Sequence, residues 1–232
     1  MKFYLLAFVL VYLCSTSVSN AQNTIGLRAG LNFSTFVYDL EDDEEDLVLD
    51  ESLLTRYYVS VPYTVGLSKH FGLEAALNFT GRGGRSEFPE YDITTDITTI
   101  ETTTTETNYI GLSLFPHYRG GSASFGFYVG AGLGFDYALS GRTTLDVLTT
   151  TSTATTSDTF TDDIDYENDN FRRTDLMLSI GGGLLVPVGE RGNINLDVRY
   201  NGGLLDQNTQ DNSSFTISNG GLLLGLGYLY RL

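Results

Sequence analysis

Residues 125–139 read FGFYVGAGLGFDYAL. Every odd position in this stretch is apolar or aromatic, whereas the even positions are mostly glycine and carry one charge, Asp136. A period of two residues predicts a β-strand with two unlike faces. Typical soluble strands have about 5–6 residues, whereas a tilted strand needs about 9–11 residues to cross a bilayer. The stretch therefore predicts a membrane-spanning strand with lipid on one face and a crowded polar lumen on the other.

Seven other segments show the same alternation. They cover residues 25–36, 57–67, 71–79, 109–118, 176–188, 194–204 and about 215–232. With 125–139 they predict eight strands. The alternation of the last segment changes phase partway along, which predicts a β-bulge near Gly220 and Gly221.

The connections between these segments alternate in length. Short turns are expected at 68–70, 119–123 and 189–193, and four long loops at about 37–54, 86–106, 143–172 and 205–214. Short periplasmic turns and long extracellular loops are typical of outer-membrane barrels. The sequence therefore predicts an all-β fold, an eight-stranded antiparallel up-and-down transmembrane β-barrel, whose closure removes exposed strand edges.

The first residues have the features of a secretory signal peptide. Lys2 precedes an apolar run over residues 3–14, and residues 19–21 form a small-x-small cleavage site. We expect a signal peptide at 1–21 and one barrel domain at 22–232. Cleavage would also remove Cys14, the one cysteine, which excludes disulfides and thiolate metal sites from the mature chain.

Charged residues within the strands support this assignment of faces. Six of them fall on the non-apolar face of their own strand, although an arginine at mid-bilayer on the lipid face costs about 2–4 kcal/mol. We expect these six residues to form a charge network in the lumen: Arg28, Glu74, Asp136, Asp197, Arg199 and Arg231.

The four long connections hold 24 of the 29 acidic residues, and the formal net charge is −16. This charge makes nucleic acid an unsuitable partner. Two acidic runs, at 39–46 and 162–169, offer carboxylates for Ca²⁺ or Mg²⁺ but do not match an EF-hand loop. The candidate ligands for weak binding of divalent cations are Asp42, Asp43, Glu44, Asp163, Asp165 and Glu167.

Catalytic patterns are scarce. The chain has two histidines, His70 and His117, and nothing in the spacing places either one with a nucleophile and an acid. The sequence predicts a protein without catalytic residues and without a cofactor.

Three short stretches resemble a known family: IGLRAGLNFS at 25–34, YIGL at 109–112 and GLGY at 225–228. The chain resembles the porin-like (PorT-like) outer-membrane β-barrel proteins common in Bacteroidota. The resemblance implies the outer membrane of a Gram-negative bacterium, contact with its lipids and insertion by barrel-assembly machinery. It implies no catalytic residues.

Four functions remain open at this point. The leading hypothesis is a non-enzymatic surface protein that stabilises the envelope or binds extracellular material through its acidic, threonine-rich loops. The alternatives are a narrow passive pore and a lipid-modifying barrel enzyme. A soluble lipocalin-like carrier fits poorly, because its lumen would be apolar and its outside charged. The sequence names no ligand and no oligomeric state.

Overall fold

The computed structural model describes residues 23–40, 50–92, 96–122, 124–210 and 215–232. Within them the chain forms ten β-strands: β1 (Thr24–Leu40), β2 (Asp50–Ser52), β3 (Leu54–Gly66), β4 (Phe71–Asp92), β5 (Ile97–Gly121), β6 (Gly126–Thr150), β7 (Thr155–Asp163), β8 (Thr174–Val188), β9 (Gly192–Gly203) and β10 (Phe215–Arg231). The expected signal peptide at 1–21 lies outside the described residues.

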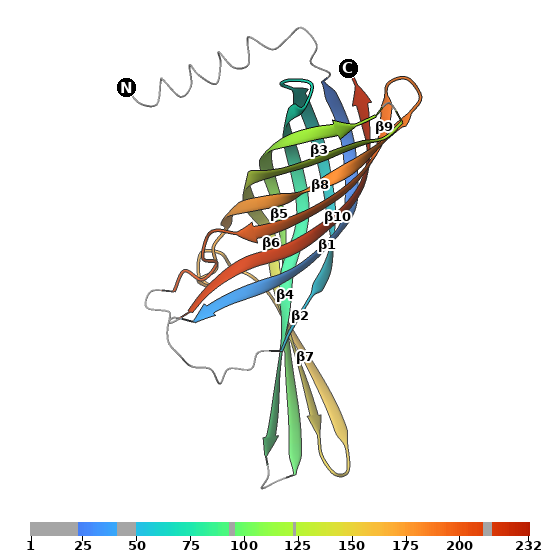
Figure 1. The fold of residues 1–232 in the computed structure, drawn as a ribbon. Coiled ribbons are helices and arrows are strands. Elements are labelled where there is room, and N and C mark those ends of the chain that lie inside the picture. The colour runs from blue at the N-terminus through green and yellow to red at the C-terminus, as the bar shows by residue number, and fades with distance from the viewer. Residues whose placement is uncertain (1–22, 41–49, 93–95, 123, 211–214) are drawn as a thin grey trace, which may run out of the picture.

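Eight of the strands close into a ring in the order β1, β3, β4, β5, β6, β8, β9 and β10. Every neighbouring pair is antiparallel, and β10 returns to β1 along its whole length, from Thr24 opposite Arg231 to Leu40 opposite Phe215. The strands wind steeply around the barrel (Figure 1). This confirms the predicted all-β, eight-stranded antiparallel barrel.

The two faces of the wall differ in the predicted way. Outward positions carry large apolar side chains that stay exposed, such as Leu112, Leu133 and Leu226. Inward positions hold buried polar and charged side chains, such as Asn32, Ser60 and Asn195. An apolar outside around a polar inside suits a wall that faces lipid.

Short turns join the strands at one end of the barrel, where β1 begins and β10 ends (Figure 1). Outward aromatic side chains lie near this end, among them Tyr63, Phe71 and Tyr118. Aromatic rings are typical of the membrane–water interface. Among the described residues, no helix is both long enough and apolar enough to cross a membrane.

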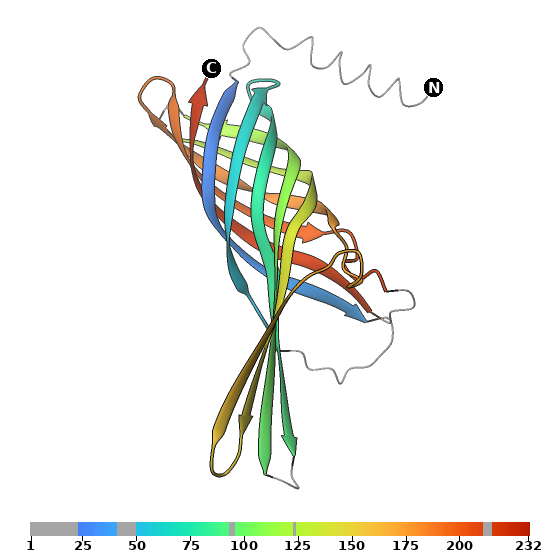
Figure 2. The same ribbon diagram turned by 180° about the vertical axis from the view of Figure 1, so that it is seen from behind.

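At the opposite end, two of the expected loops are instead β-hairpins. Residues 86–92 and 97–106 continue β4 and β5, and most of 143–172 belongs to the end of β6 and to β7. Neighbouring strands stay paired almost to the tips, with Tyr91 opposite Thr98 and Thr98 opposite Thr150. We call this four-stranded extension, formed by residues 85–92, 97–104, 143–150 and 155–163, the projecting sheet (Figure 2). Threonine has a high β-propensity and pairs well across strands, so polar composition here does not mean loop.

The expected bulge near Gly220 and Gly221 is also wrong. β10 pairs with β1 without a shift, and Ile217 continues the inward frame at the mouth of the barrel. The irregularity lies between β5 and β6 instead, where Asn108 faces Ser140 and Tyr109 faces Ala138. Leu139 is thus left out of the pairing, and the inward frame of β6 changes from even to odd residues.

Candidate functional site

The centre of the lumen holds a four-residue cluster of buried charges: Arg28 on β1, Glu74 on β4, and Asp197 and Arg199 on β9. Glu74 bridges the two arginines, with Oε2 3.0 Å from Arg28 Nη2 and Oε1 2.8 Å from Arg199 Nη2. Asp197 bridges them again, with Oδ1 2.9 Å from Arg199 Nε and 3.5 Å from Arg28 Nη1. Cations and anions alternate, so the cluster is neutral and every charge has two partners.

Neighbouring side chains fix the orientation of this cluster. Arg28 Nε donates to Asn195 Oδ1 at 2.9 Å, and the hydroxyl of Tyr128 donates to Asp197. The guanidinium carbon of Arg199 lies 4.1 Å from the ring centroid of Phe115. Hydrogen bonds together with a cation–π contact hold each guanidinium in one position.

A three-residue cluster lies nearer the projecting sheet and consists of Arg82 on β4, Asp136 on β6 and Asp175 on β8. Asp136 and Asp175 face each other directly across the β6–β8 pair. Arg82 donates to Asp136 and places Nη1 3.6 Å from Asp175 Oδ2, which also accepts from Asn219 Nδ2 at 2.8 Å. Two directly opposed carboxylates repel each other, so the positive charge of Arg82 beside them stabilises the pair.

The structure brings together most of the six charges expected in the lumen. Four form the four-residue cluster, and Asp136 belongs to the second cluster. Arg231 stands apart, half-buried at the end of β10. The sequence prediction missed Arg82 and Asp175, because it ended one strand at 79 and began another at 176. The inward frame itself was the missing signal, since even residues of β4 lead to 82 and odd residues of β8 lead back to 175.

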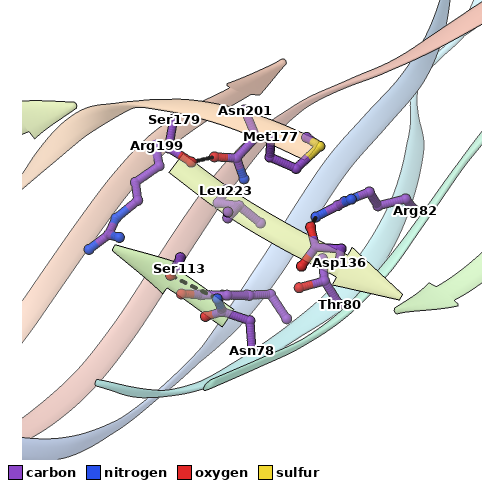
Figure 3. A pocket seen from close by; sticks show the side chains of 12 residues that line it. Asn78, Thr80, Arg82, Ser113, Asp136, Met177, Ser179, Arg199, Asn201 and Leu223 are labelled. Carbon is purple, nitrogen blue, oxygen red and sulfur yellow. Dashed lines mark hydrogen bonds and ion pairs between the residues drawn. The ribbon is translucent and has the colours of Figure 1, made fainter. Parts of the chain in front are cut away.

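A polar cavity of about 30 Å³ separates the two clusters. Arg82 and Asp136 lie at one side of it and Arg199 at the other, with Ser179 bonded to Asn201 between them (Figure 3). This is room for about one or two water molecules. Around this cavity the lumen is filled by ion pairs and polar side chains together with buried apolar groups such as Met177 and Leu223.

Two irregular segments, 164–173 and 204–210, lie at the end of the barrel from which the projecting sheet extends. The ring of Phe171 packs against Phe36 on β1 and against Tyr166, with centroids 6.3 and 6.1 Å apart. Gln207 is fully buried, and its backbone carbonyl accepts a hydrogen bond from the backbone N–H of Arg172 at 2.8 Å. These contacts hold the two segments against β1 and against each other at this end of the barrel.

The projecting sheet has two faces of different chemistry. One continues the lipid-facing frame and is rich in threonine, but it also carries Arg85, Glu87 and Tyr91. The other continues the lumen frame, with Phe160 opposite Leu145 and Asp158 opposite Val147. Phe160 is 61% exposed, and all residues of β7 are exposed. The sheet therefore carries a small apolar patch between acidic side chains.

The candidate metal ligands are scattered. Asp42, Asp43 and Glu44 lie outside the described residues. Asp163 pairs with Arg142 at 3.1 Å, and Asp165 caps its own turn, with hydrogen bonds from Asn168 and Glu167 that hold the pKa of its carboxyl below the ordinary value. Within the described ranges, no three potential metal ligands among His, Cys, Asp and Glu cluster together.

Among the described residues, neither imidazole ring is hydrogen-bonded to a nucleophilic side chain. His117 is buried on β5, where Nδ1 lies 3.1 Å from the carbonyl of Phe115 and the ring packs against Tyr128. His70 lies in the turn before β4 and stacks on Tyr118. These surroundings give His117 a packing role in the lumen.

Comparison with protein families identifies the class. Residues 20–208 match the model of the outer membrane protein beta-barrel domain. The chain belongs to this family, whose members reside in the outer membrane of Gram-negative bacteria. A search of curated proteins found no match.

Solved structures that are similar to this chain have diverse roles. Ail, the attachment invasion locus protein of Yersinia pestis, is 14% identical with a TM-score of 0.39, over 90% of this chain and 99% of Ail. OprG from Pseudomonas aeruginosa is 14% identical with a TM-score of 0.43, over 90% and 97%. The outer membrane protease OmpT from Escherichia coli is 12% identical with a TM-score of 0.41, over 94% and 98%. Similarity at this level says nothing about the role of this chain.

Proposed function

We propose that the protein is a non-enzymatic surface protein of the PorT-like group, and that it binds extracellular material through the projecting sheet. The proposal rests on a contrast between the polar side chains of the lumen and those of the projecting sheet. The lumen charges are paired with one another, whereas β7 is exposed along its whole length. Long extracellular segments are typical of small outer-membrane barrels, which supports an extracellular position for this sheet.

The alternative functions have less support. A passive pore needs open lumen, but the four-residue cluster and the cavity of about 30 Å³ leave little room. A lipid-modifying enzyme needs a reactive group within reach of a base, and His117 contacts aromatic rings and a carbonyl instead. Lipid and the barrel-assembly machinery remain proposed partners.

A trimmed barrel tests the proposal. Replacing residues 87–102 and 146–159 each by Asn-Gly joins the paired residues Ser86 to Thr103 and Leu145 to Phe160 through two-residue hairpin turns. Cells that produce the trimmed barrel should attach to one another and to protein-coated glass at least about tenfold less than cells with the full chain. The heat-modifiability of the barrel on gels should not change. Equal attachment would contradict the proposal.

The refolded barrel should conduct no steady current in planar bilayers, because its paired charges occupy the lumen. Vesicle flotation would verify that the barrel is inserted. The matched control is the triple substitution R28A/E74A/R199A, which empties the centre and should raise the frequency of open events. A steady current from the unmodified chain would support the pore instead.

We further propose weak, unselective binding of Mg²⁺ and Ca²⁺ by the acidic segments, with dissociation constants on the order of 10⁻⁴–10⁻³ M. Asp163 and Asp165 already have hydrogen-bond or ion-pair partners, so a cation would compete with them. Calorimetry on the refolded barrel measures this. A site about a hundredfold tighter, lost when the acids of 39–46 are neutralised, would contradict the prediction.

A further inference from the structure

The two long edges of the projecting sheet differ. At the β4 edge, residues 85–87 pair with β2, and Pro89, which has no N–H, follows two positions later. Both features are common protections of an exposed edge. At the other edge, β7 reads TTSDTFTDD, which contains no proline, lysine or arginine. β7 pairs with β6 alone among the elements that the structure describes.

The hydrogen bonds that flank β7 show which of its backbone groups face outward. Thr151 N donates to Ala154 O at one end of the β6–β7 pair, and Ile164 N donates to Gly141 O at the other. Opposed residues in antiparallel strands alternate between hydrogen-bonded and non-hydrogen-bonded pairs. The even residues of β7 therefore bond to β6. The odd residues direct their N–H and C=O groups away from β6, and they are Thr155, Ser157, Thr159, Thr161 and Asp163.

The side chains of β7 define the chemistry of a strand that would add there. Asp158, Phe160 and Asp162 share one face, and Phe160 extends the apolar patch of Leu145 and Val147. An added strand would place a side chain opposite each of them, at spacings of two residues. Basic side chains complement the two aspartates, and an apolar side chain complements Phe160.

We infer that β7 is a docking edge for an extended polypeptide segment with the pattern basic-x-apolar-x-basic, which binds by adding a strand to the projecting sheet. The inference rests on the proposed function and specifies the partner and the mode of binding. Main-chain hydrogen bonds along the odd residues of β7 supply affinity, and the pair Asp158 and Asp162 supplies selectivity. A second copy of β7 fits poorly, because it brings only acidic charge.

The test uses the refolded full-length barrel and a labelled nine-residue peptide, Thr-Thr-Lys-Thr-Val-Thr-Lys-Thr-Thr. Fluorescence anisotropy measures binding, and infrared spectra of the ¹³C-labelled peptide report strand formation. Changing both lysines of the peptide to glutamate should weaken binding about 2- to 30-fold, as expected for two cross-strand ion pairs. D158N/D162N should abolish this preference. Equal binding of both peptides would contradict the role of charge.

The matched pair Thr159→Pro and Thr159→Val tests strand addition itself. Both variants lose the bond from the Thr159 hydroxyl to Asp146, but only proline removes an outward N–H, and it leaves the β6–β7 bonds intact. Binding should fall about tenfold or more in Thr159→Pro relative to Thr159→Val. Ser157→Pro with Ser157→Val repeats the comparison in case one variant folds poorly.

The outcomes separate this inference from the proposed function. Equal binding by the proline and valine variants would overturn strand addition, even if the trimmed barrel no longer supports attachment. If attachment survives trimming while the peptide still discriminates proline from valine, the edge is a docking site but the surface function is wrong.

Discussion

Replacing Arg199 with alanine should lower the free energy of unfolding of the barrel by about 3–5 kcal/mol, as is typical when one partner of a buried ion pair is removed. Arg199 pairs with both Glu74 and Asp197, and its side chain is 5% exposed. The substitution leaves two buried carboxylates to share Arg28 alone. Because the chain has no tryptophan, urea unfolding in vesicles is best followed by circular dichroism and by gel mobility.

Arg56→Ala is the matched control. Arg56 pairs with Glu106 near the start of the projecting sheet, where their side chains are 19% and 35% exposed. The loss should be about 0.2–1 kcal/mol, as for other solvent-accessible pairs. Adding Glu74→Gln to Arg199→Ala should recover part of the lost stability. If the two arginine variants lose equal stability, water screens the lumen and the four-residue cluster contributes little.

The second large effect is expected at the seam where the barrel closes. Gly30 on β1 lies directly opposite Gly225 on β10, and both face the lumen. A Cβ at residue 30 would lie 1.9 Å from the backbone oxygen of Leu224, so Gly30→Val forces the two strands apart. We expect a loss of about 1–3 kcal/mol or more, which is typical of overpacking, and a lower yield of folded barrel.

Ala29→Val is the control for the seam, because it adds similar volume one residue away on the exposed, lipid-facing side. It should leave the folded yield and the urea midpoint nearly unchanged. Similar losses in both variants would show that the closeness of the backbones at the seam does not limit folding. Electrophoretic mobility without heating distinguishes closed barrels from open chains.

The alternation of side chains was enough to predict the membrane-spanning part of the fold. Leu27, Ala29 and Leu31 on one side of β1 and Arg28 on the other already defined its two faces, because a wall between lipid and lumen leaves no third environment. The same rule placed Glu74, Asp136 and Asp197 in the lumen. Which arginine meets which carboxylate depends on shear and register, which residue alternation within one strand does not encode.

The wrong loop predictions concern residues beyond the membrane-spanning wall, where no lipid-facing surface imposes an alternation of side chains. In the projecting sheet neither face is selected by lipid, so Thr102, Thr103 and Thr104 show no apolar–polar alternation that would indicate a strand. Their pairing follows from β-propensity and from a register inherited from the barrel. The strand limits at 79 and 176 were instead set where the outward apolar residues end, although the inward frame continues to Arg82 and Asp175.

The unpaired Leu139, between the barrel and the projecting sheet, is a residue that β6 can lose without changing its pairing. Because Ala138 already faces Tyr109 and Ser140 already faces Asn108, deletion of Leu139 would restore a regular ladder and leave Leu145, Asp158 and Phe160 on their present face. The membrane-spanning pairs on the other side of Leu139 would keep their register. A single-codon deletion at this position therefore disturbs the sheet less than one within the membrane-spanning wall, where it would move the following side chains of the strand to the opposite face. Lineages that carry this barrel should differ in length at this position more readily than within the wall, which sequence comparison across strains can test.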